Sequence, residues 1–218
     1  MAEIDLLRAL PRTKRDIKKR LEAKDPAVVA IAKQYGEMYF DGPREYGYGG
    51  YRYDGRWIPV ARDIVAHFGL KPGMRVLDVG CAKGFLVKDL MLACPGLEAF
   101  GLDVSLYALM HCEPGLAGRL HLGTAEKMPF PDNSFDCVLS LNTIHNFPRP
   151  RAITAMKEIQ RLSGGKAFVQ VDSYRTPEQK EIFESWVLTA EFHDYPAGWI
   201  KLFGEAGYTG DHYWTIIE

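Results

Sequence analysis

Residues 76–85, which read VLDVGCAKGF, decide the fold. The first four are typical of a buried strand, and they run into a loop over 80–84, after which a helix begins. Glycines in such a loop let the backbone turn sharply and let a ligand approach the main chain. Taken alone, the loop fits a dinucleotide site, a phosphate site or a tight turn between a strand and a helix. The Walker phosphate-binding pattern is excluded, because no Gly-Lys-Ser/Thr sequence follows.

Strand and helix patterns alternate on both sides of this loop. The apolar runs predict strands at 75–79, 98–102, 120–122, 135–141, 166–171 and 212–217. The spacing of apolar residues predicts helices at 61–68, 87–94, 106–112, 152–162, 178–189 and 199–205. Strands that alternate with helices of about ten residues indicate an α/β fold, in which helices cover both faces of a mainly parallel sheet.

The chain divides into an α/β domain over 58–218 and an appendage over 1–57. The appendage begins with a basic arm, residues 1–24, which is typical of a solvated helix face; RNA or a membrane surface is the alternative partner. An apolar stripe predicts one helix over 28–39. Residues 41–57 read DGPREYGYGGYRYDGRW, with five glycines among four tyrosines, and we expect an ordered loop that acts as a lid.

Composition narrows the classes of function. The 218 residues carry a formal net charge of −1, so no whole-chain field favours nucleic acid as a partner. No apolar run approaches the roughly 18 to 20 residues that span a bilayer, and the charged N-terminus does not resemble a signal peptide. The four cysteines form no CxxC pair, and no histidine or cysteine spacing indicates a metal site. We therefore expect a cytoplasmic protein without a metal or a membrane partner.

Two further signals follow the loop. Asp103 ends the next strand, 23 residues after Gly80, where a carboxylate can accept both hydroxyls of a ribose. The alternative is that Asp103 caps the following helix, a role that Ser105 would share. The stretch 123–147 then places a turn at 124–126, whose backbone donors would face an adenine edge.

In this order and spacing, DVGCAKG (78–84), GLDVS (101–105) and GTAEKMPFPDNSFD (123–136) resemble the motifs of class I S-adenosylmethionine-dependent methyltransferases of the small-molecule type. The resemblance covers about residues 70–172 and implies a Rossmann-like sheet of six to seven strands, with one antiparallel strand near the end. It also implies S-adenosylmethionine as cofactor and S-adenosylhomocysteine as product. The cofactor-binding residues that it implies are Asp78, Gly80, Cys81, Gly84, Asp103, Val104, Thr124, Ala125, Glu126 and Asn142.

Two residues depart from the family pattern. Ala82 stands where another glycine is usual, and alanine costs little there if its φ is negative. Thr124 stands where many relatives have aspartate, so contacts to the adenine are expected to shift toward Glu126.

Methyl transfer from a sulfonium is an in-line displacement that depends mainly on positioning, and only an acceptor such as a hydroxyl needs a base. His145, just past the fourth strand, is the candidate base, with a structural histidine as the alternative. The candidate substrate-binding residues are Tyr48, Tyr51, Arg52, Arg56 and His193. We predict O-methylation of a small polar metabolite or sugar, and the arginines would suit an anionic acceptor. The alternatives are an RNA methyltransferase that uses the basic arm and a non-catalytic S-adenosylmethionine-binding subunit.

Overall fold

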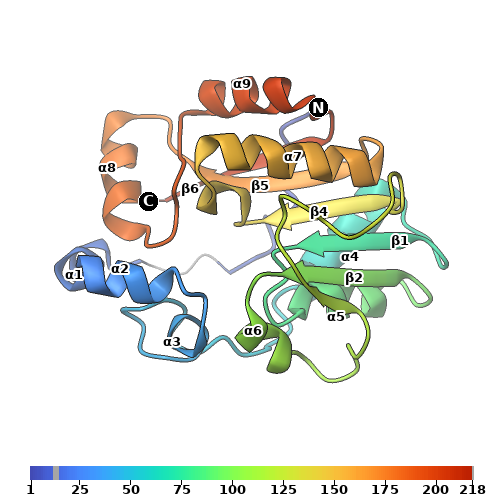
Figure 1. Cartoon of the computed structure of the whole chain (residues 1–218), viewed down its shortest axis with the longest axis horizontal. Coiled ribbons are helices and arrows are strands. Elements are labelled where there is room, and N and C mark those ends of the chain that lie inside the picture. The colour runs from blue at the N-terminus through green and yellow to red at the C-terminus, as the bar shows by residue number, and fades with distance from the viewer. Residues whose placement is uncertain (12–14, 218) are drawn as a thin grey trace.

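The computed structural model describes residues 1–11 and 15–217. Its core is a six-stranded sheet in the order β3-β2-β1-β4-β5-β6 (Figure 1). Every pairing between neighbouring strands of this sheet is parallel. The strands are β1 (Arg75–Val79), β2 (Glu98–Asp103), β3 (Leu120–Leu122), β4 (Cys137–Leu141), β5 (Ala167–Ser173) and β6 (Asp211–Ile216).

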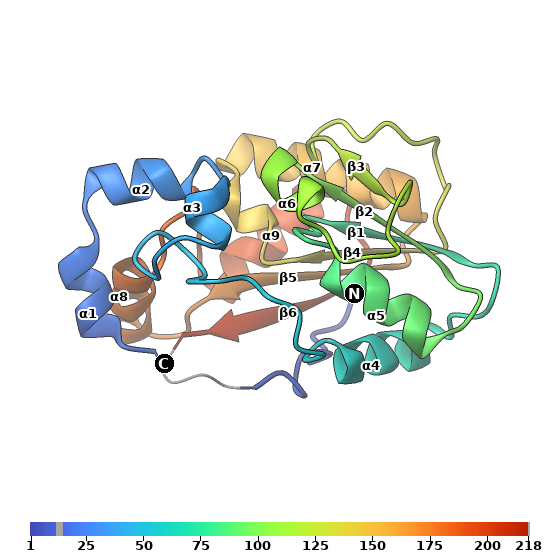
Figure 2. The same ribbon diagram turned by 90° about the horizontal axis from the view of Figure 1, so that it is seen from below.

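Helices cover both faces of the sheet: α4 and α5 lie on one side, and α7 and α9 on the other (Figure 2). A second group, α1 to α3 and α8, lies beyond the carboxyl ends of the strands (Figure 1). The helices are α1 (Ile17–Ala23), α2 (Pro26–Ala32), α3 (Glu37–Phe40), α4 (Ile58–Phe68), α5 (Phe85–Ala93), α6 (Leu106–Met110), α7 (Arg149–Ser163), α8 (Pro177–Trp186) and α9 (Pro196–Ala206), with a short 3₁₀ helix η1 (Ile144–Asn146).

The two helical layers are held by alternate residues of the central strands. In β1, Val76 packs into the cluster that contains Ile64 of α4, whereas Leu77 packs into the cluster that contains Met156 of α7. All four side chains are fully buried. Successive strand residues point to opposite faces, so a strand covered on both sides is apolar throughout. This is why the strand runs were recognisable in the sequence, and the predicted Rossmann-like α/β architecture is confirmed.

Two predicted elements differ from the structure. The apolar stripe over 28–39 does not form one helix, because the chain breaks between α2 and α3, where Tyr35 has a φ of +49°. The carbonyl of Tyr35 accepts a hydrogen bond from Ser105 Oγ (2.5 Å) at this break. No antiparallel strand occurs in the described part of the sheet. Because α8 and α9 carry the chain back to the starting end of β5, β6 pairs with β5 in parallel.

Residues 1–57 contact the rest of the chain at several places. The first residues run along the outer edge of β6, where the amide of Ile4 donates to the carbonyl of His212 (2.8 Å). Leu6 and Leu7 then enter the core beside α4. Of the basic arm, Arg12 and Lys14 lie outside the described residues. Within the described ranges, no helix has both the length and the apolar character needed to cross a bilayer.

Candidate active site

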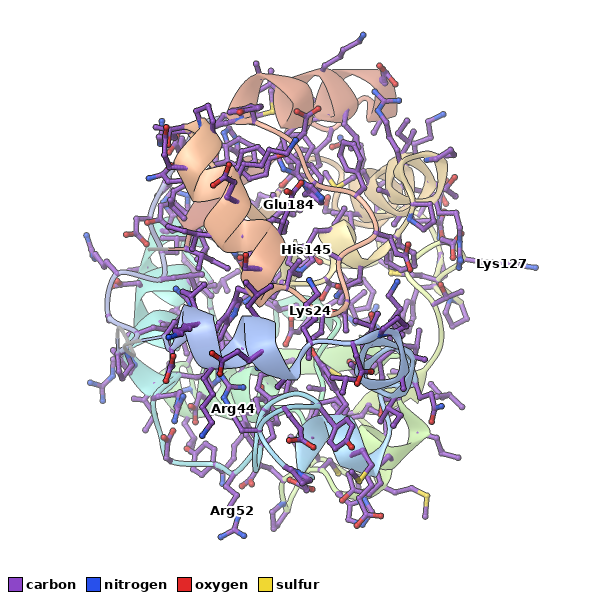
Figure 3. All side chains as sticks on the ribbon, turned by 90° about the vertical axis from the view of Figure 1, so that its left-hand side faces the viewer. Lys24, Arg44, Arg52, Lys127, His145 and Glu184 are labelled. Atoms are coloured by element: carbon purple, nitrogen blue, oxygen red, sulfur yellow. The ribbon has the colours of Figure 1, made fainter. Side chains whose placement is uncertain are left out.

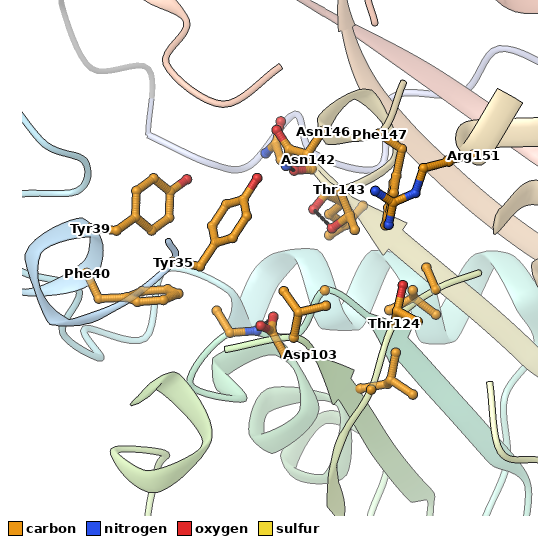
Figure 4. A pocket seen from close by; sticks show the side chains of 18 of the residues that line it. Tyr35, Tyr39, Phe40, Asp103, Thr124, Asn142, Thr143, Asn146, Phe147 and Arg151 are labelled. Carbon is orange, nitrogen blue, oxygen red and sulfur yellow. Dashed lines mark hydrogen bonds between the residues drawn. The ribbon is translucent and has the colours of Figure 1, made fainter. Parts of the chain in front are cut away.

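A cleft of about 330 Å³ lies at the carboxyl ends of β1, β2 and β4, beneath the lid (Figure 4). A smaller recess of about 50 Å³ adjoins it. The residues predicted from sequence that line the main cleft are Gly80, Asp103, Val104, Thr124, Ala125, Asn142 and Tyr48. Those that line only the recess are Asp78, Cys81 and Tyr51. The structure thus brings most of the predicted cofactor residues to one place.

The loop after β1 leaves no room for side chains at two positions. Gly80 has a φ of +85°, and a Cβ there would collide with the Thr143 side chain. Gly84 has a φ of +77°, and a Cβ there would collide with Leu116; it lines neither cavity and serves the turn into α5. Ala82 does not have the negative φ at which alanine is unstrained. Its φ is +50°, in the left-handed region. This position carries backbone strain of about 1 kcal/mol.

Asp103 is held rigidly at the end of β2. One carboxylate oxygen accepts the amide of Ala82 (2.7 Å) and the other accepts the amide of Ser105 (2.8 Å). The first residue after the N-cap of α6 is Leu106, and it is Ser105 that caps the helix, with its hydroxyl accepting the amide of Ala108 (3.0 Å). Asp103 therefore bridges two loops and faces the cleft, where its remaining lone pairs suit a pair of hydroxyls.

Asp78 is a buried carboxylate without a donor. Among the described residues none gives it a hydrogen bond or an ion pair, and its side chain borders the recess beside Gly80. Burial, with a smaller contribution from the negative charge of Asp103, raises the pKa of Asp78 to about 7. A buried carboxyl of this kind is stabilised as an anion only by a cation or by donors. The α-amino group of S-adenosylmethionine would supply both, so the recess fits the aminoacid end of that cofactor.

The adenine side of the cleft differs from the prediction at Glu126. Val104 is 50% exposed and offers an apolar surface to a flat ring, and Ala125 and Thr124 lie beside it in the lining. Glu126 lines neither cavity, because Arg151 of α7 binds both of its carboxylate oxygens. Hydrogen bonds from Arg151 hold the pKa of Glu126 below its usual value. The sequence analysis missed Arg151, which lines the cleft in place of Glu126.

Aromatic rings of the lid and of the segment just before it cover the cleft. Tyr35, Tyr39 and Phe40 stand on one side of the cleft (Figure 4). The rings of Tyr35 and Tyr39 pack edge to face with their centroids 5.3 Å apart, and those of Tyr39 and Tyr48 do so at 5.2 Å. Tyr51 instead stacks on Phe85 of α5 with a centroid distance of 4.5 Å. Aromatic pairs of this kind add to the stability of this wall of the cleft.

The two arginines predicted to bind an acceptor lie outside the cleft. Arg52 is exposed and projects away from the molecule (Figure 3). Arg56 is also exposed, and its guanidinium is paired with Asp54 two residues away (2.6 Å). Neither is positioned to bind an anion in the cleft, because Arg56 is already paired with Asp54 and Arg52 faces solvent.

The geometry at His145 argues against a base role. Its ring is buried, and Nδ1 lies 3.2 Å from the backbone amide of Asp172, which can only donate. The neutral ring must therefore carry its proton on Nε2, where it cannot accept another. Burial also lowers the pKa of His145. His193 lines neither cavity and contacts the Tyr174 hydroxyl through Nδ1 (3.0 Å).

Asn146 is a cleft residue whose importance the sequence did not indicate. Its Nδ2 donates to the carbonyl of Asn142 (3.1 Å), which fixes the orientation of the amide. Its Oδ1 is buried and has no hydrogen-bond partner among the described residues. Asn142 has a φ of +53°, an unusual backbone conformation that concentrates at functional sites. The described residues contain no group of three or more histidine, cysteine or acidic side chains arranged to hold a metal ion.

A parallel sheet with a glycine loop after β1 and a carboxylate at the end of β2 defines a Rossmann-like nucleoside-binding protein. Comparison with known families is more specific. Residues 77–169 match the methyltransferase domain family. Over these residues the resemblance to class I S-adenosylmethionine-dependent methyltransferases is confirmed, a family whose members use S-adenosylmethionine as methyl donor.

Known relatives act on different acceptors. The chain is 39% identical over 99 residues to a sterol 24-C-methyltransferase of Gibberella zeae, a match that covers 41% of this chain and 26% of that protein. It is 30% identical over 131 residues to the demethylmenaquinone methyltransferase of Symbiobacterium thermophilum, covering 55% of this chain and 50% of that one. The chain thus spans half or less of the length of these curated relatives.

Solved structures share the fold at low sequence identity. One is a chain of the complex that contains the Haloferax volcanii Trm112 methyltransferase activator, with a TM-score of 0.57 and 22% identity. The superposition covers 69% of this chain and 67% of that one. This similarity supports the Rossmann-like architecture alone.

Proposed function

We propose that the chain transfers a methyl group from S-adenosylmethionine to an oxygen of a small, polar, hydroxyl-bearing acceptor. The observation that carries this proposal is the buried Oδ1 of Asn146, which lines the cleft and lacks a donor. An unpaired buried acceptor costs about 1–3 kcal/mol. A hydroxyl group of a ligand recovers this free energy and is thereby oriented beside Asn142.

Different residues around the cleft bind different parts of the cofactor. Asp103 holds the ribose hydroxyls, Asp78 holds the aminoacid end, and Val104 packs on the adenine. The cofactor supplies a methyl group that is already activated on a sulfonium. The residues of the chain therefore act by orienting the two ligands and by excluding water. Tyr35 and Tyr39 border the same space, and their rings attract a sulfonium through cation–π interaction.

The hydroxyls of Tyr35 and Tyr39 act as neutral hydrogen-bond donors. Burial raises the pKa of both Tyr35 and Tyr39. Tyr35 lies across the cleft from Asn142 and Asn146 (Figure 4). A polar acceptor between these side chains meets donors on one side and the Asn146 carbonyl on the other. This arrangement favours a sugar or hydroxy acid over an apolar lipid.

The packing of the basic arm favours a small acceptor over RNA. Arg20 is buried, and Lys24 donates to the backbone carbonyl of Glu184 (2.5 Å). The arm is thus part of the fold that supports the lid. Aromatic rings of this lid cover the cleft, whereas a nucleotide within an RNA needs an open approach.

Release of S-adenosylhomocysteine provides the test. The purified chain is incubated with S-adenosylmethionine and either a panel of sugars, sugar phosphates and hydroxy acids or total RNA. We expect turnover with a member of the small-molecule panel and an O-methyl product by mass spectrometry and NMR. Methyl groups found on RNA, on carbon or on nitrogen would overturn the proposal. Tight cofactor binding with no turnover on any acceptor would favour a binding subunit.

Asn146→Ala tests the residue that carries the proposal. We expect the KM for the small acceptor to rise about tenfold, because one hydrogen bond to the acceptor is lost. The affinity for S-adenosylhomocysteine should not change. Arg52→Gln is the matched control, since Arg52 is exposed and lies outside the cleft. An unchanged KM in Asn146→Ala would remove the proposed contact.

A further inference from the structure

Three arginines surround one indole at the carboxyl-terminal end of α8. The guanidinium carbons of Arg15, Arg20 and Arg44 lie 5.7, 4.9 and 5.4 Å from the centroid of the Trp186 ring. We call these three residues the arginine cluster. They come from different segments: one precedes α1, one lies within α1, and one belongs to the lid. Contact with an indole face orders a guanidinium without neutralising its charge.

The arginine cluster is not neutralised by an ion pair, although Arg15 interacts electrostatically with the carboxylate of Asp172. Within residues 1–11 and 15–217, none of its members forms an ion pair with a carboxylate. Arg20, only 8% exposed, donates to the backbone carbonyl of Glu45 (2.7 Å). Arg44 donates to the carbonyl of Gly47. These acceptors are neutral, so the positive charges stay unpaired.

The positive charges of the arginine cluster repel one another. Burial lowers the pKa of Arg20, and the charge of Arg44 lowers it further. Burial also lowers the pKa of Arg44, and the positive charge of Arg15 contributes to this lowering. The end of α8 contributes a helix-dipole charge of only about −0.5, which does not balance three guanidinium groups. An anion placed among them would relieve this repulsion.

The arginine cluster lies behind the aromatic wall of the cleft. Arg20 and Arg44 both interact electrostatically with Tyr39, which lines the cleft. Arg44 belongs to the lid itself and is exposed to solvent, on the side of the molecule that Figure 3 shows. A ligand can therefore reach the cluster from the solvent side.

We propose that the arginine cluster is an anion-binding site that takes a carboxylate or phosphate group carried by the methyl acceptor. Guanidinium groups bind both anions through paired N–H donors, and two or three of them on one oxyanion form a specific site. The proposal rests on the proposed function, because it assigns a charge to the same acceptor. It also gives the basic residues of the arm and lid a role other than binding RNA.

Binding of simple anions tests the site directly. The protein, saturated with S-adenosylhomocysteine, is titrated with inorganic phosphate or with acetate against chloride at constant ionic strength. Thermal unfolding and ³¹P NMR line broadening report the binding. We expect phosphate, acetate or both to raise the unfolding midpoint more than chloride does, and the comparison shows which group is preferred.

Two variants assign the effect to the arginine cluster. Arg44→Gln should weaken the binding of the preferred anion about tenfold, because it removes one charge-assisted hydrogen bond. Arg52→Gln, in the same lid but remote from Trp186, should bind it as the parent does. Equal binding by both variants, or stabilisation by chloride alone, would show that the cluster only packs against Trp186.

The same samples separate the two proposals. If S-adenosylhomocysteine binds normally and phosphate and acetate do not, the anion site is refuted and the methyl-transfer proposal stands. If S-adenosylhomocysteine fails to bind, the proposed function fails, whatever the anions do. Unchanged S-adenosylhomocysteine affinity in Arg44→Gln shows that this variant is folded.

Discussion

Lys83 Nζ lies 2.6 Å from Asp41 Oδ2, and this ion pair joins the loop after β1 to the lid. The same carboxylate accepts the Tyr107 hydroxyl (2.8 Å) and the amide of Tyr51 (3.1 Å). Burial alone would raise the pKa of Asp41, but the hydrogen bonds from Lys83 and Tyr107 outweigh it, and the pKa is lowered. Asp41 is therefore ionised, and it couples the position of the lid to that of the cofactor loop.

Removal of this charge should loosen the lid. In Asp41→Asn the ammonium of Lys83, whose side chain is only 9% exposed, loses its counter-ion. We expect the free energy of unfolding to fall by about 1–3 kcal/mol in urea titrations, less than for a fully buried pair because Asp41 is partly solvated. The affinity for S-adenosylhomocysteine should fall about tenfold. Asp54→Asn breaks the exposed pair with Arg56 and should cost less than about 1 kcal/mol. Equal losses in the two variants would contradict the coupling.

Asp103→Asn should separate ribose binding from helix capping. Ser105 caps α6 by itself, so the helix should persist in the variant. The affinity for S-adenosylhomocysteine, measured by calorimetry, should fall at least about a hundredfold, because two hydrogen bonds to a charged group are lost. Glu126→Gln is the matched control, since Arg151 occupies that carboxylate. A comparable loss in the control would restore the direct adenine contact that the sequence predicted.

The sequence was sufficient to locate the strands of the sheet and the loop after β1. β1 was predicted with the bounds that the structure has, Arg75–Val79, because a strand buried on both faces is a continuous apolar run. The loop after it and the carboxylate one strand over also lie where predicted. Both follow from the geometry of parallel strands, whose carboxyl ends meet at one edge of the sheet.

Side-chain pairings between distant segments could not be predicted. From the sequence alone, Glu126 is predicted to contact the adenine. In the folded chain, α7 places Arg151 against Glu126. The three arginines of the lid lie in one stretch rich in glycine and tyrosine, yet Arg44 contacts Trp186 while Arg52 faces solvent. Local patterns hold no information about these partners, which lie 25 or more positions away along the chain and are set by how the layers pack.

Asp78 should make cofactor binding depend on pH. Its pKa is raised to about 7 in the free protein, whereas an unfolded aspartate titrates near about 3.9. Because the folded state binds this proton more tightly, the stabilisation that it provides is complete below about pH 4 and is lost as the pH rises through 7. A bound ammonium group requires the ionised form. The affinity for S-adenosylhomocysteine should therefore fall about tenfold for each pH unit below 7 and be constant just above it.

Calorimetry between pH 5.5 and 8 checks this dependence. Below pH 7, binding should release close to one proton, which buffers of different ionisation enthalpy detect. Asp78→Asn should bind more weakly at pH 8 and show a flat profile. A sloping profile retained by this variant would assign the proton to another group, such as Asp103.

Two substitutions of His145 test whether its ring has a structural role or acts as a base. In His145→Asn the amide oxygen can still accept the Asp172 amide, whereas His145→Ala leaves that amide unpaired and opens a cavity. We expect the alanine variant to lose about 2–4 kcal/mol of unfolding free energy and the asparagine variant about half as much. The pH profile of turnover should keep its shape in His145→Asn. Loss of the acidic limb of the profile in that variant would show that the ring acts as a base after all.

Asn142 allows backbone strain to be separated from a role in the cleft. Asn142 has a φ of +53°. This conformation strains glycine little, whereas it raises the free energy of alanine by about 1 kcal/mol. We therefore expect Asn142→Gly to match the parent in urea unfolding and Asn142→Ala to be less stable by about 1 kcal/mol. Both variants lose the amide that lines the cleft, so both should turn over about tenfold more slowly, because one hydrogen bond that positions the acceptor is lost.

Asn133 provides the control for this comparison. It has nearly the same backbone conformation, with a φ of +51°, but it lies outside the cleft, beside α7. Asn133→Gly should leave turnover unchanged. If Asn142→Gly turns over as fast as Asn133→Gly, the amide of Asn142 does not position the acceptor. Its left-handed conformation then serves only to bring the chain from β4 into η1.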